Sequence, residues 1–205
     1  MMVLITHHHM EVLVINVAKI VQIIQQIIQM LVVFAIVFCH RKKWLDIKKN
    51  MNMDIYDFVG EKFEGKVDKN GESYFYGHLK RVAHYAYDSD YLPYDIREKL
   101  YDIGLLHDIF EDTDTTEDEL REVEGVTDEV IEIVKILTRC KDETYMQYIE
   151  RVSINEIATT VKLCDLRDNM DIRRYRELDD SAISLLKRYH KAYWFLKNAI
   201  DEEFN

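Results

Sequence analysis

Four residues in three separate segments of the chain could together bind one metal ion. His78 lies in the first segment, the adjacent His107 and Asp108 lie in the second, and Asp165 lies in the third. Two imidazoles and two carboxylates make a mixed nitrogen and oxygen ligand set, which suits Mn²⁺, Fe²⁺, Co²⁺ or Zn²⁺ and leaves coordination positions open for water and substrate. The set therefore predicts a catalytic metal site rather than a structural one.

The sequence around these residues strengthens the metal hypothesis. One His-Asp dipeptide is expected about once by chance in a chain of this composition, so the pair alone carries little weight. His107 and Asp108, however, follow the apolar stretch 103–106, and Asp165 lies between two leucines. Ionisable side chains on a buried helix face are costly unless they have a partner such as a metal ion.

Two acidic residues follow the metal pair at helical spacing. Glu111 lies four residues after His107, and Asp112 lies four residues after Asp108, so both acids are expected on the same side of the helix end. A metal ion lowers the pKa of its bound water towards about 7, and a nearby carboxylate then serves as base or acid. Glu111 and Asp112 are thus the candidate catalytic pair for hydrolysis of a phosphoester or pyrophosphate. The alternative is a solvated acidic helix end.

The elements that must position these side chains are expected to be helices. Only six glycines and one proline interrupt the 205 residues, which favours long helices over many short strands. We expect N-caps at Thr116 and Thr127. The apolar spacing predicts a loop over residues 66–73 and helices over residues 54–63, 77–87, 94–110, 130–137, 143–152, 155–170 and 181–203. An all-α fold follows.

Composition narrows the class of protein. The formal net charge of -11 argues against a protein that coats DNA or RNA, because such proteins carry an excess of lysine and arginine, so no nucleic-acid partner is expected. The three cysteines are widely spaced and form no CxxC pair, which is typical of a protein in the reducing cytoplasm. The length suits one full-sized domain with one active site.

The first fifty residues differ from the rest and are interpreted as an apolar leader, with the catalytic domain at 51–205. Residues 20–39 carry no charge and are followed by a basic cluster at 40–43. This pattern would suit an extra N-terminal apolar helix that tethers a cytoplasmic enzyme to a membrane. Four glutamines in its first half favour the alternative, an amphipathic or non-native extension with Met51 or Met53 as the true start.

Three ordered motifs resemble the HD hydrolase domain of the RelA/SpoT alarmone enzymes and their single-domain relatives. They are GHLKRVA at 77–83, LLHDIFEDT at 105–113 and VKLCDLRDNM at 161–170. The resemblance extends through 68–83 and 126–139 and implies an HD-type helical bundle. It also implies that His78, His107, Asp108 and Asp165 bind Mn²⁺, that Glu111 and Asp112 are catalytic, and that Asn169 holds the substrate.

The resemblance implies a small-molecule nucleotide substrate. Members of that family remove the 3′-pyrophosphate of guanosine tetra- and pentaphosphate, giving GDP or GTP. Asp68-Lys69 stands where the family often has an Arg-Lys pair, and Ser73 replaces a proline, so the base preference stays open. Lys69, Lys141 and Tyr189 are further candidates for substrate contact. The alternatives are a phosphohydrolase for a deoxynucleotide or a phosphorylated nicotinamide cofactor, and a nucleotide-sensing module without turnover.

Overall fold

The computed structural model describes Met30 and residues 53–203. The chain divides into two units, residues 1–51 and 52–205, and apart from Met30 all the described residues belong to the second unit. Apart from Met30, the apolar leader expected over residues 1–50, with its anchor at 20–39, lies outside the described residues. Within the part that is described, no helix combines the length and the apolar character needed to cross a bilayer.

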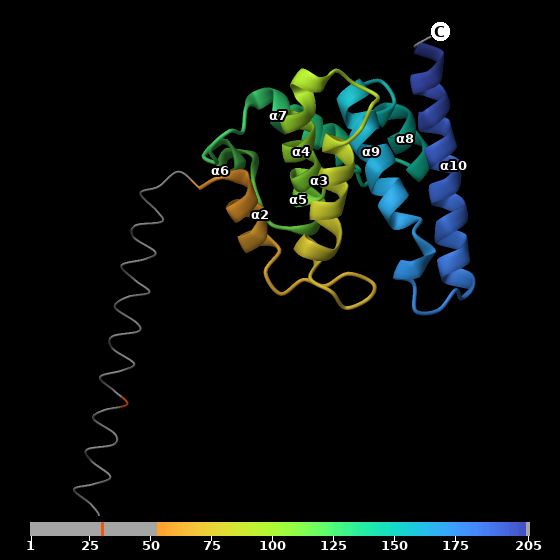
Figure 1. Ribbon diagram of the computed structural model, residues 1–205, viewed down its shortest axis with the longest axis horizontal. Coiled ribbons are helices and arrows are strands. Elements are labelled where there is room, and N and C mark those ends of the chain that lie inside the picture. Colours follow the sequence, from red (N-terminus) through yellow and green to blue (C-terminus); the bar gives the residue numbers. More distant parts are fainter. Residues whose placement is uncertain (1–29, 31–52, 204–205) are drawn as a thin grey trace, which may run out of the picture. The chain divides into compact units, whose positions relative to one another are not determined.

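The second unit is helical, as the sequence predicted, and its described residues contain no β-strand (Figure 1). The elements in chain order are α2 (Ile55–Lys62), the π-helix η1 (Phe75–Leu79), α3 (Lys80–Tyr87), the 3-10 helix η2 (Tyr94–Ile96), α4 (Arg97–Leu106), α5 (Ile109–Asp112), α6 (Glu117–Arg121), α7 (Asp128–Leu137), α8 (Tyr145–Val152), α9 (Glu156–Asn169), the 3-10 helix η3 (Ile172–Arg174) and α10 (Asp180–Glu203).

Local sequence explains where several helices begin. Thr116 and Thr127 each accept a hydrogen bond from the backbone amide three residues on, which confirms both expected N-caps. Thr144 forms a capping box with Gln147 at the start of α8, and Asn155 caps α9. These side chains satisfy amide groups that have no partner inside the helix, and each contributes about 1 kcal/mol.

Two elements that carry expected ligands depart from the regular helices predicted. His78 lies on η1, where the chain forms a π-helical turn before continuing as α3. The helix predicted over 94–110 is interrupted, because α4 ends at Leu106 and α5 begins only at Ile109. Asp108 has φ -102° and ψ 5° at this break, outside the helical range. Both ligand segments therefore lie at irregularities that hydrophobic periodicity does not reveal.

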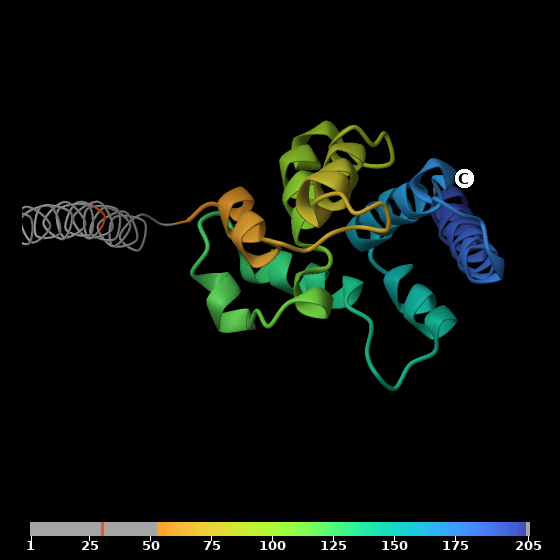
Figure 2. The ribbon, with the colours of Figure 1, turned by 90° about the horizontal axis from the view of Figure 1, so that it is seen from below.

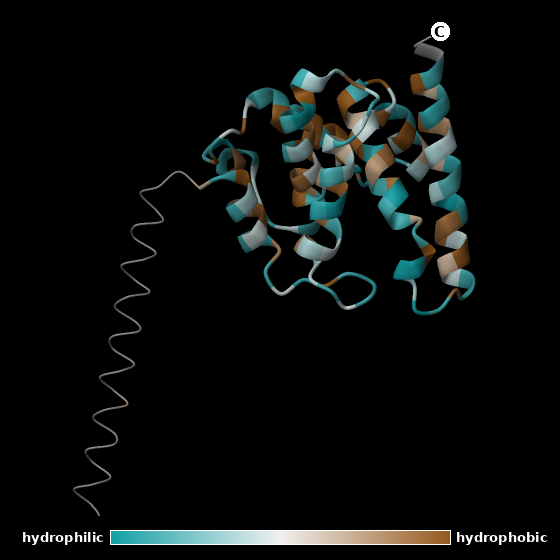
Figure 3. Cartoon of the chain, in the orientation of Figure 1, coloured by the Kyte–Doolittle hydropathy of each residue, from teal (hydrophilic) through white to brown (hydrophobic). Residues whose placement is uncertain are grey.

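The core of this unit is centred on the pair α3 and α4, with α9 packed against both helices and α10 beside α9 (Figures 1 and 2). Gly104 makes the close approach of α3 and α4 possible, since a Cβ atom there would lie 2.6 Å from the Cα atom of Ala83. Leu79, Ile103 and Val161 are fully buried members of the same core. Hydrophobic positions of these helices gather in the middle of the unit (Figure 3), so the ligand-bearing segments rest on a packed scaffold.

Asp102 is a half-buried acid on α4 whose neutralisation should stabilise the protein. Burial, together with the negative charges of Glu98 and Asp54, raises its pKa from 3.8 to about 6. The folded state therefore holds this proton more tightly than the unfolded chain, and stability falls as pH rises from about 4 to 6.

We expect Asp102→Asn to raise the free energy of unfolding at pH 7 by about 1 kcal/mol, a figure reduced for solvent screening of this half-buried group. The gain should shrink towards nothing below about pH 3, where Asp102 is largely protonated in both states. Urea unfolding at several pH values measures it. An equal gain in the free energy of unfolding at low and at neutral pH would show that the charge of Asp102 is not the cause.

Candidate metal centre

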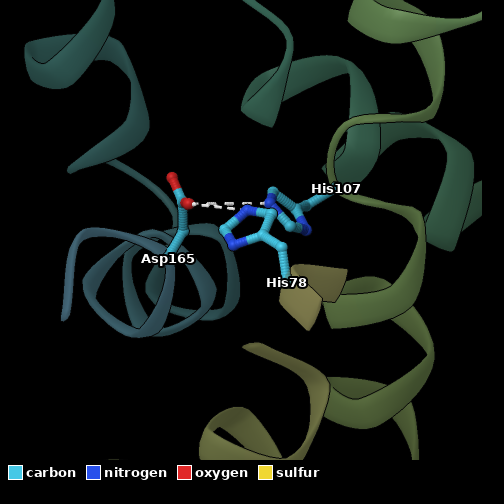
Figure 4. Close-up of side chains that lie close together, drawn as sticks. All are labelled: His78, His107 and Asp165. Carbon is cyan, nitrogen blue, oxygen red and sulfur yellow. Dashed lines mark ion pairs between the residues drawn. The ribbon is translucent and has the colours of Figure 1, made fainter. Parts of the chain in front are cut away.

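The expected ligands converge on one point, although they come from separate elements. His78 comes from η1, His107 and Asp108 come from the break between α4 and α5, and Asp165 comes from α9. Asp165 Oδ1 lies 3.4 Å from His78 Nε2 and 3.7 Å from His107 Nε2 (Figure 4). Asp108 Oδ2 lies 3.6 Å and 3.1 Å from the same two nitrogens. The two histidines and Asp165 are buried, with 1–4 % of their surface exposed.

These separations fit a metal ion. An ion with bonds of about 2.1 Å to each ligand holds neighbouring donor atoms about 3.0–3.5 Å apart. His78, His107 and Asp165 each offer one ligand atom, and these three atoms lie within 4.8 Å of one another. The buried group could therefore hold a metal ion, with Asp108 beside it.

Both imidazoles are fixed with Nε2 facing the centre. The Nδ1–H group of His107 donates to the carbonyl oxygen of Gly104 at 2.8 Å, so that in the neutral ring Nε2 is the nitrogen with the free lone pair. That Nε2 is buried and makes no hydrogen bond with any described residue, because Asp108 approaches it outside hydrogen-bonding geometry. Nδ1 of His78 lies 2.7 Å from Asp168 Oδ2. Such outer partners commonly orient histidines that bind metals.

The two carboxylates and the two imidazoles of the site shift one another's pKa values. Burial by itself would lower the pKa of His107, but Asp108 and Asp165 outweigh this effect and raise it to about 9. His78 responds in the same way, and its pKa lies well above the ordinary value. The pKa values of the two carboxyl groups, which burial would raise, are held low by the histidines and by Lys162. Protons on the imidazoles thus balance the two carboxylates, and a divalent ion could take their place.

The carboxylate of Asp165 is anchored at both oxygens. Lys162 Nζ donates to Oδ2 at 2.7 Å, and Asn169 Nδ2 donates to Oδ1 at 2.5 Å. All three residues lie on α9 at spacings of three or four residues, which places them on one helix face. Tyr74 similarly donates its hydroxyl to Asp108 Oδ2 at 2.7 Å. The ligands are therefore held in place by surrounding donors.

The two acids of the expected catalytic pair lie beside the metal centre in the same cavity. Both side chains are open to solvent on one side, yet enough protein surrounds the carboxyl groups that burial raises both pKa values. Glu111 Oε1 accepts a hydrogen bond from the backbone amide of Arg139 at 2.5 Å. Asp112 is further affected by the negative charge of Asp108. A carboxylate with a raised pKa beside a metal centre suits proton transfer.

The cavity has a volume of about 310 Å³, and His78, Asp108, Asp165 and both acids line it, with His107 buried behind them. Five cationic side chains line it, although the chain as a whole is acidic: Lys69, Arg139, Lys162, Arg174 and Arg188. Aromatic rings lie between the cations. Arg188 lies over the rings of Tyr145 and Tyr189, at 4.7 Å and 5.6 Å from their centroids. The cavity wall is thus suited to bind an anion that carries an aromatic ring.

The substrate-contact residues expected from the sequence divide into two groups. Lys69, Asn169 and Tyr189 line the cavity, with the Asn169 amide bonded to Asp165. Lys141 is exposed and does not line it, and Arg139, two residues earlier, faces the cavity instead. Hydrophobic spacing offered no signal for Arg139, because it follows the end of α7.

Sequence reasoning also missed other residues of the cavity wall. Lys162 lies three residues before the expected ligand Asp165, and Arg188 lies one residue before Tyr189, an expected substrate contact. Tyr74, Tyr145 and Tyr148 complete the aromatic lining. A second cavity of about 410 Å³ lies on the other face of α9, around Cys164 and Arg167, and no histidine lines it. The candidate ligands His78, Asp108 and Asp165 line the smaller cavity instead.

Comparisons with known proteins do not assign this chain to a family. No protein-family model matches it, and no curated protein matches it. The functional argument therefore rests on the geometry of the metal centre.

Proposed function

We propose that this chain is a metal-dependent phosphohydrolase with an HD-type helical bundle. The observation that carries the proposal is the buried group of His78, His107 and Asp165, which opens with Asp108 into a cavity lined by cations. Phosphate is the anion that such a wall of Lys and Arg side chains recognises. The nitrogen and oxygen ligands favour Mn²⁺ or a similar divalent transition metal.

The reaction would divide its tasks among named residues. When bound, the divalent ion supplies Lewis acidity and lowers the pKa of water, so that hydroxide is available at neutral pH. Glu111 accepts the proton of the attacking water, and Asp112 lies beside it to orient that water. Arg139 and Lys162 neutralise the charge that develops on the phosphoryl oxygens.

Guanosine tetra- or pentaphosphate is the substrate we propose, because the three ordered motifs resemble the alarmone hydrolases. Water would attack the phosphorus attached to the ribose 3′ oxygen, and the bond between that oxygen and phosphorus would break. The 3′ oxygen takes up a proton, and GDP or GTP and pyrophosphate leave. Lys69 and Arg188, with the ring of Tyr189 between them in the wall, are the proposed contacts for the rest of the nucleotide.

Nucleotide hydrolysis in the presence and absence of metal tests this proposal. The full chain is incubated with Mn²⁺ and guanosine tetraphosphate, a deoxynucleoside triphosphate or a phosphorylated nicotinamide cofactor, beside samples with chelator. Release of pyrophosphate from guanosine tetraphosphate only when Mn²⁺ is present is the expected result. Activity confined to another nucleotide would keep the metal chemistry and replace the substrate. Inactivity on the whole panel would contradict the proposed function.

A matched pair of cationic residues tests the cavity wall. Arg139→Ala should raise KM about 10-fold, because a charge-assisted contact with phosphate contributes about 1.4 kcal/mol or more. Lys141→Ala should leave KM within about 2-fold, because Lys141 is exposed and does not line the cavity. Steady-state kinetics of both variants measure the difference. Equal effects would show that general surface charge, rather than the cavity wall, attracts the substrate.

A further inference from the structure

The ring of His78 is held from behind by a residue that does not belong to the ligand set. Asp168 Oδ2 lies 2.7 Å from His78 Nδ1, and the carboxylate is only 2 % exposed. Arg81 Nε donates to Asp168 Oδ1 at 2.7 Å, and Arg174 also donates to the carboxylate. Because Asp168 accepts from Nδ1, Nε2 of His78 is left as the nitrogen that faces the other ligands.

Arg174 joins this carboxylate to a second one on a different segment. Its Nη1 donates to the carbonyl oxygen of Asp168 at 3.0 Å, and its Nη2 donates to Asp68 Oδ2 at 3.2 Å. Asp68 Oδ1 in turn accepts from the backbone amides of Asn70 and Glu72, at 2.9 Å and 3.1 Å. Asp68 therefore shapes the loop 66–73 with one oxygen and binds Arg174 with the other.

The same loop supplies a side chain to the cavity. Lys69, next to Asp68, lines the cavity and donates to the hydroxyl of Tyr175 at 2.9 Å. That hydroxyl donates to the carbonyl oxygen of Asn169 at 2.9 Å. The contacts of Asp68 with Arg174 and of Lys69 with Tyr175 thus attach the loop to the segment that follows α9.

The positive and negative charges of this network balance. Asp68 and Asp168 carry two negative charges, and Arg81 and Arg174 carry two positive ones. Arg81 Nη2 also lies 4.0 Å from Asp68 Oδ2, so each carboxylate faces both guanidinium groups. Removing one buried member would leave an uncompensated charge. The two guanidinium groups thus hold the Asp168 carboxylate in place as the acceptor for His78 Nδ1.

We propose that Asp168 and Arg174 are positioning residues, in which Asp168 fixes His78 as a ligand and Arg174 couples that ligand to the loop 66–73. The ion involved is the one in the proposed function, on which this inference rests. Metal binding immobilises His78, and the network passes this restraint through Asp168 and Arg174 to Asp68. The loop then holds Lys69 at the cavity when the metal is in place.

Titration of the full chain with MnCl₂ tests the role of Asp168 without any substrate. Asp168→Asn keeps an oxygen acceptor for His78 but removes the charge, and it should weaken Mn²⁺ binding about 10- to 100-fold. The control is Asp171→Asn, which removes a surface ion pair with Arg173 but keeps an oxygen that can accept from the Arg173 backbone amide, and it should bind Mn²⁺ within about 2-fold of the wild-type protein. Circular dichroism confirms that each variant is folded.

Hydrogen exchange tests the coupling of His78 to the loop 66–73 through Arg174. This test does not require the Asp168 variant to fold. In the wild-type protein, Mn²⁺ should slow exchange of the Asn70 and Glu72 amides about 10-fold, because both donate to Asp68. Arg174→Lys keeps the charge but cannot bridge two carboxylates, so the slowing should disappear while Mn²⁺ still binds.

The outcomes separate this inference from the proposed function. Folded Asp168→Asn that binds Mn²⁺ as the wild-type protein does would overturn the role of Asp168. Slowing that persists in Arg174→Lys, or is absent from the wild-type protein with Mn²⁺ bound, would overturn the coupling. A wild-type protein that binds no Mn²⁺ would instead contradict the metal centre itself.

Discussion

Replacing Asp108 with alanine should abolish both Mn²⁺ retention and phosphohydrolase turnover. Asp108 Oδ2 lies within 3.6 Å of both histidine nitrogens, so its loss removes one of the two carboxylates that face them. The two imidazoles would then face Asp165 alone. We expect kcat to fall at least about 1,000-fold, since a metal ion supplies several kcal/mol of transition-state stabilisation.

Metal analysis and steady-state kinetics of Asp108→Ala measure these losses, and Asp114→Ala is the matched control. Asp114 is on the same acidic stretch, and its side chain is 97 % exposed, so its loss should change neither Mn²⁺ content nor kcat by more than about 2-fold. An Asp108→Ala protein that keeps full Mn²⁺ occupancy would show that Asp108 is not a ligand.

Glu111→Gln should separate catalysis from metal binding. The amide keeps the size of the side chain and an oxygen that can accept from the backbone amide of Arg139, but it cannot take a proton from water. Loss of a general base lowers kcat by about 100- to 10,000-fold. Mn²⁺ affinity should change less than about 3-fold, because Glu111 does not belong to the buried ligand group.

The comparison of Glu111→Gln with Asp108→Ala assigns the roles of the two acids. Kinetics at saturating Mn²⁺ and a Mn²⁺ titration are measured on both proteins. Equal metal loss in the two variants would mean that Glu111 is itself a ligand. Full activity of Glu111→Gln would move the role of base to Asp112, which lies in the same cavity.

Much of the helical fold could be predicted from the sequence, because helix starts depend on local chemistry. Thr116 and Thr127 bond to amides three residues away, and such contacts need no knowledge of the tertiary structure. The break at His107-Asp108 could not be predicted in this way. The apolar spacing continues through it to Phe110, whereas the backbone of Asp108 leaves the helical range there.

The candidate ligands could be predicted because ionisable residues interrupt apolar segments, which is costly unless they meet a partner. The cavity wall could not, because a cation on a loop or helix face looks like any solvated lysine or arginine. Arg139 and Lys141 are equally plausible in sequence, and only the turn after α7 decides which of them faces the cavity. Asp68 is similar: its partner Arg174 is 106 residues away.

Direct titration with Mn²⁺ tests the central claim most simply. The full chain is dialysed against chelator, freed of the chelator and titrated with MnCl₂ at pH 7, with His107→Ala measured alongside. One ion bound per chain, with binding weakened at least about 100-fold in the variant, is the result that the metal centre predicts. The absence of saturable binding, or binding that is unchanged in His107→Ala, would contradict it.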